Sequence, residues 1–225
     1  MSNKKLLPSK RLIFYDLDGT LVDTRKDIAA AANYMLRQFG KPFLEERKIS
    51  RYVGRGLHHL VKSCLKTEDG REIEKGAALY RAYYSEHMLD HSRLYPGVKE
   101  ILDYFKNQKQ IVLTNKPNPF SQKLLEALGL APYFAEIIAG NSPYPKKPDP
   151  GAILAVIQRE KISSEETFFI GDSPVDIETA RRAGVQVAVV THGFGEADEL
   201  KSARPDLIVK DFNELLSWIR KQDAP

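Results

Sequence analysis

The spacing of hydrophobic residues divides the chain into an all-helical stretch and a stretch in which short strands alternate with helices. Residues 12–15 form a continuous apolar run that is too short for a helix and is typical of a buried strand. Between residues 24 and 93, apolar residues recur only at helical spacing. From residue 110 to residue 219, strand-like runs and helical patterns alternate. Such alternation predicts a parallel sheet.

The predicted strands lie at 12–15, 111–113, 136–139, 168–170, 187–190 and, as a short edge strand, 207–209. The predicted helices lie at or around 28–39, 57–65, 73–84, 98–105, 120–128, 153–157, 175–183 and 212–219. This order predicts an α/β fold, a Rossmann-like parallel sheet with helices on both faces. We expect residues 1–23 and 93–225 to form this core domain. Residues 24–92 are expected to form an inserted all-helical cap domain that emerges directly after the first strand.

Composition excludes several classes of protein. The net charge of +4, from 34 basic and 30 acidic residues, is a mild bias and gives little support for nucleic-acid binding. Lys4, Lys5, Lys10 and Arg11 form a dense basic patch, which we interpret as a solvated tail without a secretory signal. No apolar run approaches the length of a membrane span. Cys64 is the single cysteine, so an internal disulfide is excluded and a cytoplasmic location is expected.

Polar clusters follow four of the predicted strands. Asp16 and Asp18 come directly after the first strand and precede a glycine and a threonine, although this sequence also suits an ordinary turn. The other clusters are Thr114-Asn115, residues 146–150 and residues 171–176. In a parallel sheet the carboxyl ends of the strands share one edge, which is where ligands bind. The four clusters are therefore expected to meet.

Each cluster also has a purely structural interpretation. Asn118-Pro119, Asp149-Pro150 and Ser173-Pro174 are typical of helix caps followed by proline in the first turn. Asp176 suits the first turn of a helix, where an acid is favoured by the helix dipole. Lys147 taken alone is an ordinary solvated lysine. A hydroxyl, a lysine and two acid pairs are all expected at one edge of the sheet. A purely structural role explains each of them singly better than it explains all of them together.

The expected set suits phosphoryl transfer. Asp16, Asp18, Asp172 and Asp176 would place several negative charges close together, which is tolerable only beside a divalent cation. Ligation by oxygen alone favours Mg²⁺. Thr114, together with a lysine at 147, would hold the phosphoryl group and its transition state.

In order and spacing these clusters resemble the four motifs of the haloacid dehalogenase superfamily. The motifs are Asp16-Leu-Asp18-Gly-Thr20, Thr114-Asn115, Lys147-Pro148 and Gly171-Asp172-Ser-Pro-Val-Asp176. The helical insert resembles the small cap of that superfamily's first subclass. Residues 114–117, 147–150 and 191–195 are most similar to the phosphoglycolate phosphatase group.

The resemblance implies roles for individual residues. Asp16 would attack phosphorus and form an aspartyl-phosphate, while Asp18 would protonate the leaving oxygen and later activate water. The family's metal ligands correspond to Asp16, the backbone carbonyl of Asp18, and Asp172. Asp176 would ligate the metal or orient its shell.

Thr114, Asn115 and Lys147 would bind the phosphoryl group, although Lys146 leaves the lysine register open. The implied enzyme is a Mg²⁺-dependent phosphatase acting on a small phosphorylated metabolite such as 2-phosphoglycolate. An inorganic pyrophosphatase, a nucleotidase and a sugar-phosphate phosphatase remain alternatives within the superfamily. A phospho-accepting signalling domain is the alternative outside enzymes, and the oligomeric state stays open.

The cap must select the substrate, because the core motifs handle only the phosphate. In residues 52–56 two glycines flank Arg55, which we expect to pair with a carboxylate of the substrate when the loop meets the core. The alternative is a helix–helix turn with a solvated arginine. The roles of His58, His59 and His192 stay open.

Overall fold

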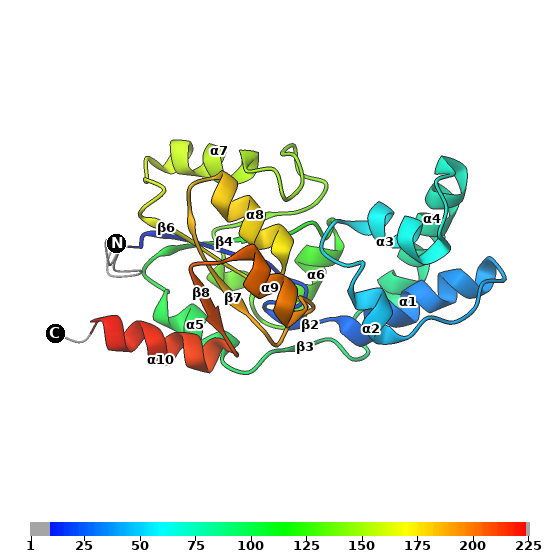
Figure 1. The fold of residues 1–225 in the computed structure, drawn as a ribbon, viewed down its shortest axis with the longest axis horizontal. Helices are drawn as coiled ribbons and strands as arrows, with labels where there is room; N and C mark the ends of the chain where they lie inside the picture. Colours follow the sequence, from blue (N-terminus) through cyan, green and yellow to red (C-terminus); the bar gives the residue numbers. More distant parts are fainter. Residues whose placement is uncertain (1–9, 224–225) are drawn as a thin grey trace.

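A computed structural model describes residues 10–223 of the chain (Figure 1). Lys4 and Lys5 of the predicted basic tail lie outside the described residues. Within the described part, no helix combines the length and the apolar character needed to cross a membrane. Figure 1 shows the sheet and its helices on one side and the helices α1–α4 gathered beside it.

The predicted parallel sheet is confirmed. It has six strands in the order β5-β4-β1-β6-β7-β8, and every neighbouring pair is parallel. The strands are β1 (Leu12–Tyr15), β4 (Lys109–Leu113), β5 (Glu136–Ile138), β6 (Thr167–Gly171), β7 (Gln186–Val190) and β8 (Leu207–Val209). All four residues of β1 are fully buried, because β1 is a central strand between β4 and β6. Its carboxyl end therefore opens between two other strand ends.

Helices cover both faces of the sheet, as the alternation predicts. Alternate β1 residues pack on opposite faces: Ile13 and Tyr15 belong to one apolar cluster, Leu12 and Phe14 to the other. The first cluster includes residues of α5 (Val98–Tyr104), α6 (Phe120–Ala127) and α10 (Phe212–Asp223). The second includes residues of α7 (Gly151–Glu160), α8 (Pro174–Arg182) and α9 (Ala197–Ala203).

The region after β1 is helical, with α1 (Arg25–Gln38), α2 (Glu46–Ser50), α3 (Leu57–Leu65) and α4 (Gly70–His87). Its apolar residues, such as Met35 and Tyr84, continue the first cluster of the sheet. Two antiparallel strands of two residues each, β2 (Val22–Asp23) and β3 (Arg93–Leu94), form its base. The hydrophobic pattern did not predict this pair, nor α2, α9 and the 3-10 turn at Ala131–Tyr133. The division into two domains at residues 24 and 92 stays a proposal.

Asp27 fastens the returning chain to the first helix of the insert. Its buried carboxylate accepts hydrogen bonds from the backbone N–H groups of His91 and Ser92 and from the Ser92 hydroxyl, at 2.7–3.1 Å. The His91 ring lies 3.0 Å from the other oxygen. The insert is thereby tied to its base at both of its ends.

Candidate active site

Asp16 and Asp18 lie at the carboxyl end of β1, as the sequence predicts. The backbone N–H of Asp16 continues the sheet by donating to Ile170 at 3.0 Å, and the carboxylate is buried. The chain then turns through Gly19, whose φ of +84° strains any residue with a side chain. A Cβ at Gly19 would also come within 2.3 Å of an Asp172 oxygen. This glycine lets the first acid motif approach the fourth.

Lys147, rather than Lys146, faces the first motif. Its ammonium nitrogen lies 2.9 Å from Oδ1 of Asp16 and 2.7 Å from Oδ1 of Asp176, and the residue is buried. Burial acts to lower the pKa of Lys147, but the two carboxylates outweigh it and raise the pKa above its usual value. Lys146 is exposed. The ammonium of Lys147 is therefore a fixed positive charge beside the predicted nucleophile.

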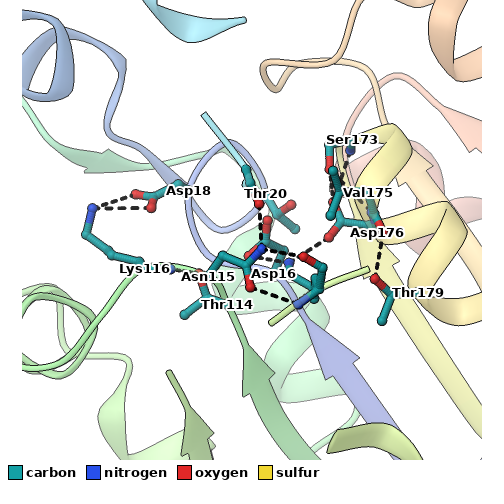
Figure 2. Close-up of polar contacts among 12 residues, drawn as sticks. Asp16, Asp18, Thr20, Thr114, Asn115, Lys116, Ser173, Val175, Asp176 and Thr179 are labelled. Atoms are coloured by element: carbon teal, nitrogen blue, oxygen red, sulfur yellow. Dashed lines mark hydrogen bonds and ion pairs between the residues drawn. The ribbon is translucent and has the colours of Figure 1, made fainter. Parts of the chain in front are cut away.

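The fourth motif combines a helix cap with two buried acids. Ser173 caps α8 in a capping box with Asp176, which is the structural interpretation of this stretch. One oxygen of Asp176 accepts from the backbone N–H groups of Asp172 and Ser173 and from the Ser173 hydroxyl, and the other faces Lys147. Both oxygens of Asp176 are thus already engaged with the protein (Figure 2).

Asp172 is positioned by two donors from outside its own loop. Its Oδ1 accepts from the Thr20 hydroxyl and its Oδ2 from the backbone N–H of Phe194, each at 2.7 Å. Burial, followed by the charges of Asp176 and Asp16, raises its pKa well above the usual value. Thr20 and the loop that holds Phe194 had no assigned role in the sequence analysis. The two glycines that flank Phe194 could have indicated that this loop passes close to another part of the chain, here Asp172.

Three carboxylates could hold a divalent cation. Asp16, Asp172 and Asp176 each offer an oxygen within 4.8 Å of the others, and all three are buried. Burial raises the pKa of Asp16 to about 6 despite the nearby Lys147, and Asp176 adds to the rise. Three buried acids with only one lysine among them leave excess negative charge, so the donor set fits a hard cation such as Mg²⁺. Asp176 is paired with the Lys147 ammonium, whereas the donors to Asp172 are both neutral, so Asp172 keeps more of its negative charge for a cation.

Asp18 lies outside this carboxylate group. Its Oδ1 accepts from the Thr24 hydroxyl at 2.7 Å, and its oxygens lie 3.0 and 3.2 Å from the ammonium nitrogen of Lys116 (Figure 2). Its side chain is therefore not placed as a metal ligand here, in contrast to the expectation for four acids in one cluster. Only its backbone carbonyl, the atom that the family resemblance assigns, remains a candidate for that role.

Thr114 and Asn115 follow β4 and line the same cavity as Asp16. Asn115 donates from Nδ2 to the Gly54 carbonyl at 2.7 Å and to the Lys147 carbonyl at 2.9 Å, and its Oδ1 accepts from the backbone N–H of Lys147. Both amide hydrogens are thus used within the protein. In this arrangement the side chain ties the insert to the Lys147 loop, and its expected contact with phosphate stays a prediction.

Lys116 was not singled out by the sequence analysis. Besides meeting Asp18, its ammonium group donates to the Tyr84 hydroxyl at 2.8 Å, and the residue is 9% exposed. Tyr84 belongs to α4 of the insert and is buried. Its burial, and to a smaller extent the negative charge of Asp18, raise the pKa of its hydroxyl. Its position directly after Thr114 and Asn115 could have marked Lys116 as a site residue. Its hydrogen bond to Tyr84 could not have been predicted, because the two residues lie far apart in the sequence.

Arg55 is not brought to the site. It is exposed and is not among the residues that line the cavity, and its side chain has no hydrogen bond or ion pair within residues 10–223. The expected role would need a movement of the loop. His58 pairs with Glu74 on the surface, and His59 lies 3.3 Å from the Tyr52 carbonyl.

His192 contacts the first motif through the backbone. Its Nε2 lies 3.1 Å from the Thr20 carbonyl and its ring stacks on Tyr95 at 3.9 Å. Burial lowers the pKa of His192, which favours the neutral ring. This geometry fixes the turn after the first acid motif and does not bring the imidazole to the cavity, which His192 does not line.

The site opens into a cavity of about 60 Å³ between the core and the insert. Core residues at its floor include Asp16, Asp18 and Thr114. Its upper wall comes from the insert and is mostly apolar, with Ile28, Val53, Leu57, Leu60, Tyr80 and Tyr84. The reactive groups therefore face a small space whose insert side is lined mostly by apolar side chains.

Comparison with known proteins agrees with this arrangement. Residues 13–190 match the family described as haloacid dehalogenase-like hydrolase. The chain is 36% identical over 215 residues to phosphoglycolate phosphatase 1 of Pseudomonas aeruginosa, an alignment that covers 92% of this chain and 78% of that protein. It is 33% identical to the phosphoglycolate phosphatase of Vibrio parahaemolyticus, over 93% of this chain and 96% of that protein.

Solved structures share the whole fold. The crystal structure of a predicted phosphoglycolate phosphatase from Haemophilus somnus superposes with a TM-score of 0.89 at 30% identity, covering 94% of this chain and 99% of that one. A haloacid dehalogenase-like hydrolase from Streptococcus pneumoniae gives a TM-score of 0.84 at 27% identity, with the same coverage. The helical insert is included in both alignments at this coverage.

Proposed function

Since the chain belongs to the haloacid dehalogenase-like hydrolases, we propose that it is a Mg²⁺-dependent phosphatase that transfers the phosphoryl group of a small monoester to Asp16 and then to water. The observation that carries the proposal is the buried Asp16 carboxylate, 2.9 Å from Lys147 and facing the cavity. A carboxylate nucleophile divides the hydrolysis of a stable ester into two easier steps.

In the first step an Asp16 oxygen forms a bond to phosphorus while the bond to the leaving oxygen breaks. Asp18, on the same turn, gives a proton to the leaving oxygen. In the second step Asp18 takes a proton from water, whose oxygen attacks phosphorus and releases phosphate from Asp16. Lys147 supplies positive charge to the phosphoryl oxygens throughout, and Thr114 supplies a hydroxyl donor.

Asp16, Asp172 and the backbone carbonyl of Asp18 would hold the metal ion. When bound, Mg²⁺ offsets the negative charge that gathers on the phosphoryl oxygens and on the carboxylates. Asp176 acts on Lys147 rather than on the metal, since its charge is paired with the lysine ammonium at 2.7 Å. The excess of buried negative charge in the absence of a cation supports this assignment.

For the substrate we propose 2-phosphoglycolate, which would be hydrolysed to glycolate and phosphate. Two considerations support it: the relatives named above are phosphoglycolate phosphatases, and the cavity of about 60 Å³ is small. In this arrangement of core and insert, a small ester fits the space better than a nucleotide or a hexose phosphate. The partner is thus a small phosphorylated metabolite, and the insert acts as the cap that encloses it.

The test is a steady-state screen of the purified protein with Mg²⁺ against 2-phosphoglycolate, pyrophosphate, nucleoside monophosphates and sugar phosphates. We expect the highest kcat/KM for 2-phosphoglycolate. A higher value for any of the other substrates would replace this substrate assignment. Absence of turnover on every substrate, including a generic aryl phosphate, would overturn the catalytic proposal itself.

A further inference from the structure

We propose that Lys116 recognises the negative charge of the leaving group and so selects phosphate esters of small hydroxy acids. This inference rests on the proposed function and adds a specificity residue to it. Lys116 follows β4 at the cavity wall and is nearly buried, at 9% exposure. It is the one cationic side chain among the described residues that line the cavity.

The surroundings of Lys116 favour a charged partner. Its ammonium group lies 4.5 Å from the centre of the Tyr84 ring, and the neighbouring walls carry Leu57, Leu60 and Phe120. In such surroundings a charge is costly unless an opposite charge or several hydrogen bonds accompany it. At present the partners are Asp18 and the Tyr84 hydroxyl.

Lys116 also lies where the far end of a short substrate must be. A phosphoryl group bound at Asp16 and Lys147 directs its ester oxygen towards Asp18, the proton donor. The Lys116 ammonium lies 3.0 Å from Oδ1 of Asp18. The substrate atoms that follow the ester oxygen would therefore lie beside this ammonium. A carboxylate two carbons from the phosphate ester would share this ammonium with Asp18.

The size of the cavity restricts the recognised group. A cavity of about 60 Å³ holds roughly four water molecules, so only a fragment of a few non-hydrogen atoms fits beside the phosphoryl group. A carboxymethyl group is of this size. An uncharged group of equal size fits as well but forms no ion pair with Lys116, so the discrimination is by charge rather than by shape.

Tyr84 connects this recognition to the insert. Lys116 belongs to the core and Tyr84 to α4, so their hydrogen bond of 2.8 Å spans the two parts. The ammonium keeps both of its partners, Asp18 of the core and Tyr84 of the insert, only while the insert covers the site. Selection by charge would therefore operate in the closed arrangement, where water is excluded and the ion pair is strongest.

The experiment compares two substrates that differ in charge and by one oxygen atom: 2-phosphoglycolate and 2-hydroxyethyl phosphate, in which CH₂OH replaces the carboxylate. For each protein the measured quantity is the ratio of the two kcat/KM values. The variants are Lys116→Met, Lys116→Arg and Tyr84→Phe. Lys123→Met is the matched control, since Lys123 is exposed on α6 and does not line the cavity. Thermal unfolding checks that each variant is folded.

We expect Lys116→Met to lower the ratio about thirtyfold or more, which is the usual effect of removing one partner of a buried charge pair. Lys116→Arg should keep most of the preference, and Tyr84→Phe should lower the ratio about fivefold, because Lys116 loses one hydrogen bond. Lys123→Met should leave the ratio unchanged. If Lys116→Met does not fold, an unchanged ratio in Tyr84→Phe overturns the inference.

The outcomes separate the inference from the proposed function. If the wild-type protein shows no preference for 2-phosphoglycolate over 2-hydroxyethyl phosphate, both the substrate assignment and the inference are wrong. If the wild type has the preference and Lys116→Met retains it, only the inference is wrong. Equal losses on the two substrates would mean that Lys116 merely positions Asp18. A loss of the ratio in Arg55→Ala with none in Lys116→Met would assign the recognition to Arg55.

Discussion

The ammonium nitrogen of Lys147 lies 2.7 Å from Oδ1 of Asp176, and both residues are buried. The other oxygen of Asp176 is saturated by three donors of its own loop. Asp176 is thus a rigid anchor for the lysine. From this relationship we propose a positioning role for the last acid of the fourth motif, which its sequence position alone does not reveal.

We predict that Asp176→Asn lowers kcat/KM about tenfold to a hundredfold. The amide keeps the size of the side chain but removes the charge that holds Lys147, and an NH₂ group then faces either the lysine or the backbone donors. The expected change in KM exceeds that in kcat if Lys147 serves mainly to bind the phosphoryl group. Steady-state kinetics with 2-phosphoglycolate measures both.

Glu178→Gln on the same helix is the matched control, because Glu178 pairs with Arg182 on the surface. This variant should retain wild-type kinetics, as surface ion pairs contribute little. Wild-type kinetics in Asp176→Asn would show that Lys147 needs no anchor. Complete loss of Mg²⁺ binding in that variant would instead return Asp176 to the metal ligands.

A second prediction concerns the attachment of the insert to the core. Asn115→Ala removes three hydrogen bonds to Gly54 and Lys147 and leaves buried backbone groups without partners. We expect a loss of about 1–3 kcal/mol in the free energy of unfolding in urea. Hydrogen exchange in residues 52–57 should become faster, because the loop loses its contact with the core.

Asn141→Ala provides the comparison. Asn141 exchanges a similar pair of amide hydrogen bonds with the backbone of Asn118, but on the exposed surface and away from the insert. It should leave exchange in residues 52–57 unchanged. Equal exchange rates in the two variants would contradict the role of Asn115 in holding the insert.

The third prediction is that stabilisation by Mg²⁺ increases with pH. The pKa of Asp16 in the metal-free fold is about 6, above its ordinary value of 3.8, so protonated Asp16 stabilises the fold at low pH and this contribution is lost as the pH rises through about 6. Asp172 is shifted in the same direction. A cation binds only the ionised acids, and its binding stabilises the folded state.

The measurement is the shift in Tm on adding Mg²⁺, taken at a pH below 6 and again above 7. The shift should be larger at the higher pH, and Asp172→Asn should reduce it at both. Burial lowers the pKa of His192, so its titration also changes the stability of the fold. This change is expected to be the same with and without Mg²⁺ and therefore cancels in the Tm shift. A shift that does not depend on pH would argue against these acids as the binding site.

Much of the fold follows from the sequence, for physical reasons. A central strand buried on both faces requires a continuous apolar run, so β1 was predicted within its observed bounds. The two-residue strands β2 and β3 escaped prediction, because so short a ladder has no hydrophobic period. Asp149 and Asn118 precede helices as expected, but their prolines lie one position before the first helical residue.

The sequence predicted those site residues whose position follows from the end of a strand. Asp16, Thr114, Lys147 and Asp172 all lie at one edge of the sheet, as parallel topology demands. The pairing of side chains was not predictable, because Lys116 depends on Tyr84 from another part of the chain. Arg55, chosen for its flanking glycines, lies on the exposed side of its loop.

The most direct test of the account is a search for the phosphorylated enzyme. Wild-type protein turning over 2-phosphoglycolate with Mg²⁺ is quenched in acid within milliseconds and digested at low pH, and mass spectrometry locates the phosphate. The account predicts phosphate on Asp16 in the wild type, and neither phosphate nor turnover in a folded Asp16→Asn variant, since an amide is a far weaker nucleophile. Phosphate on another residue, or full activity in Asp16→Asn, would contradict it.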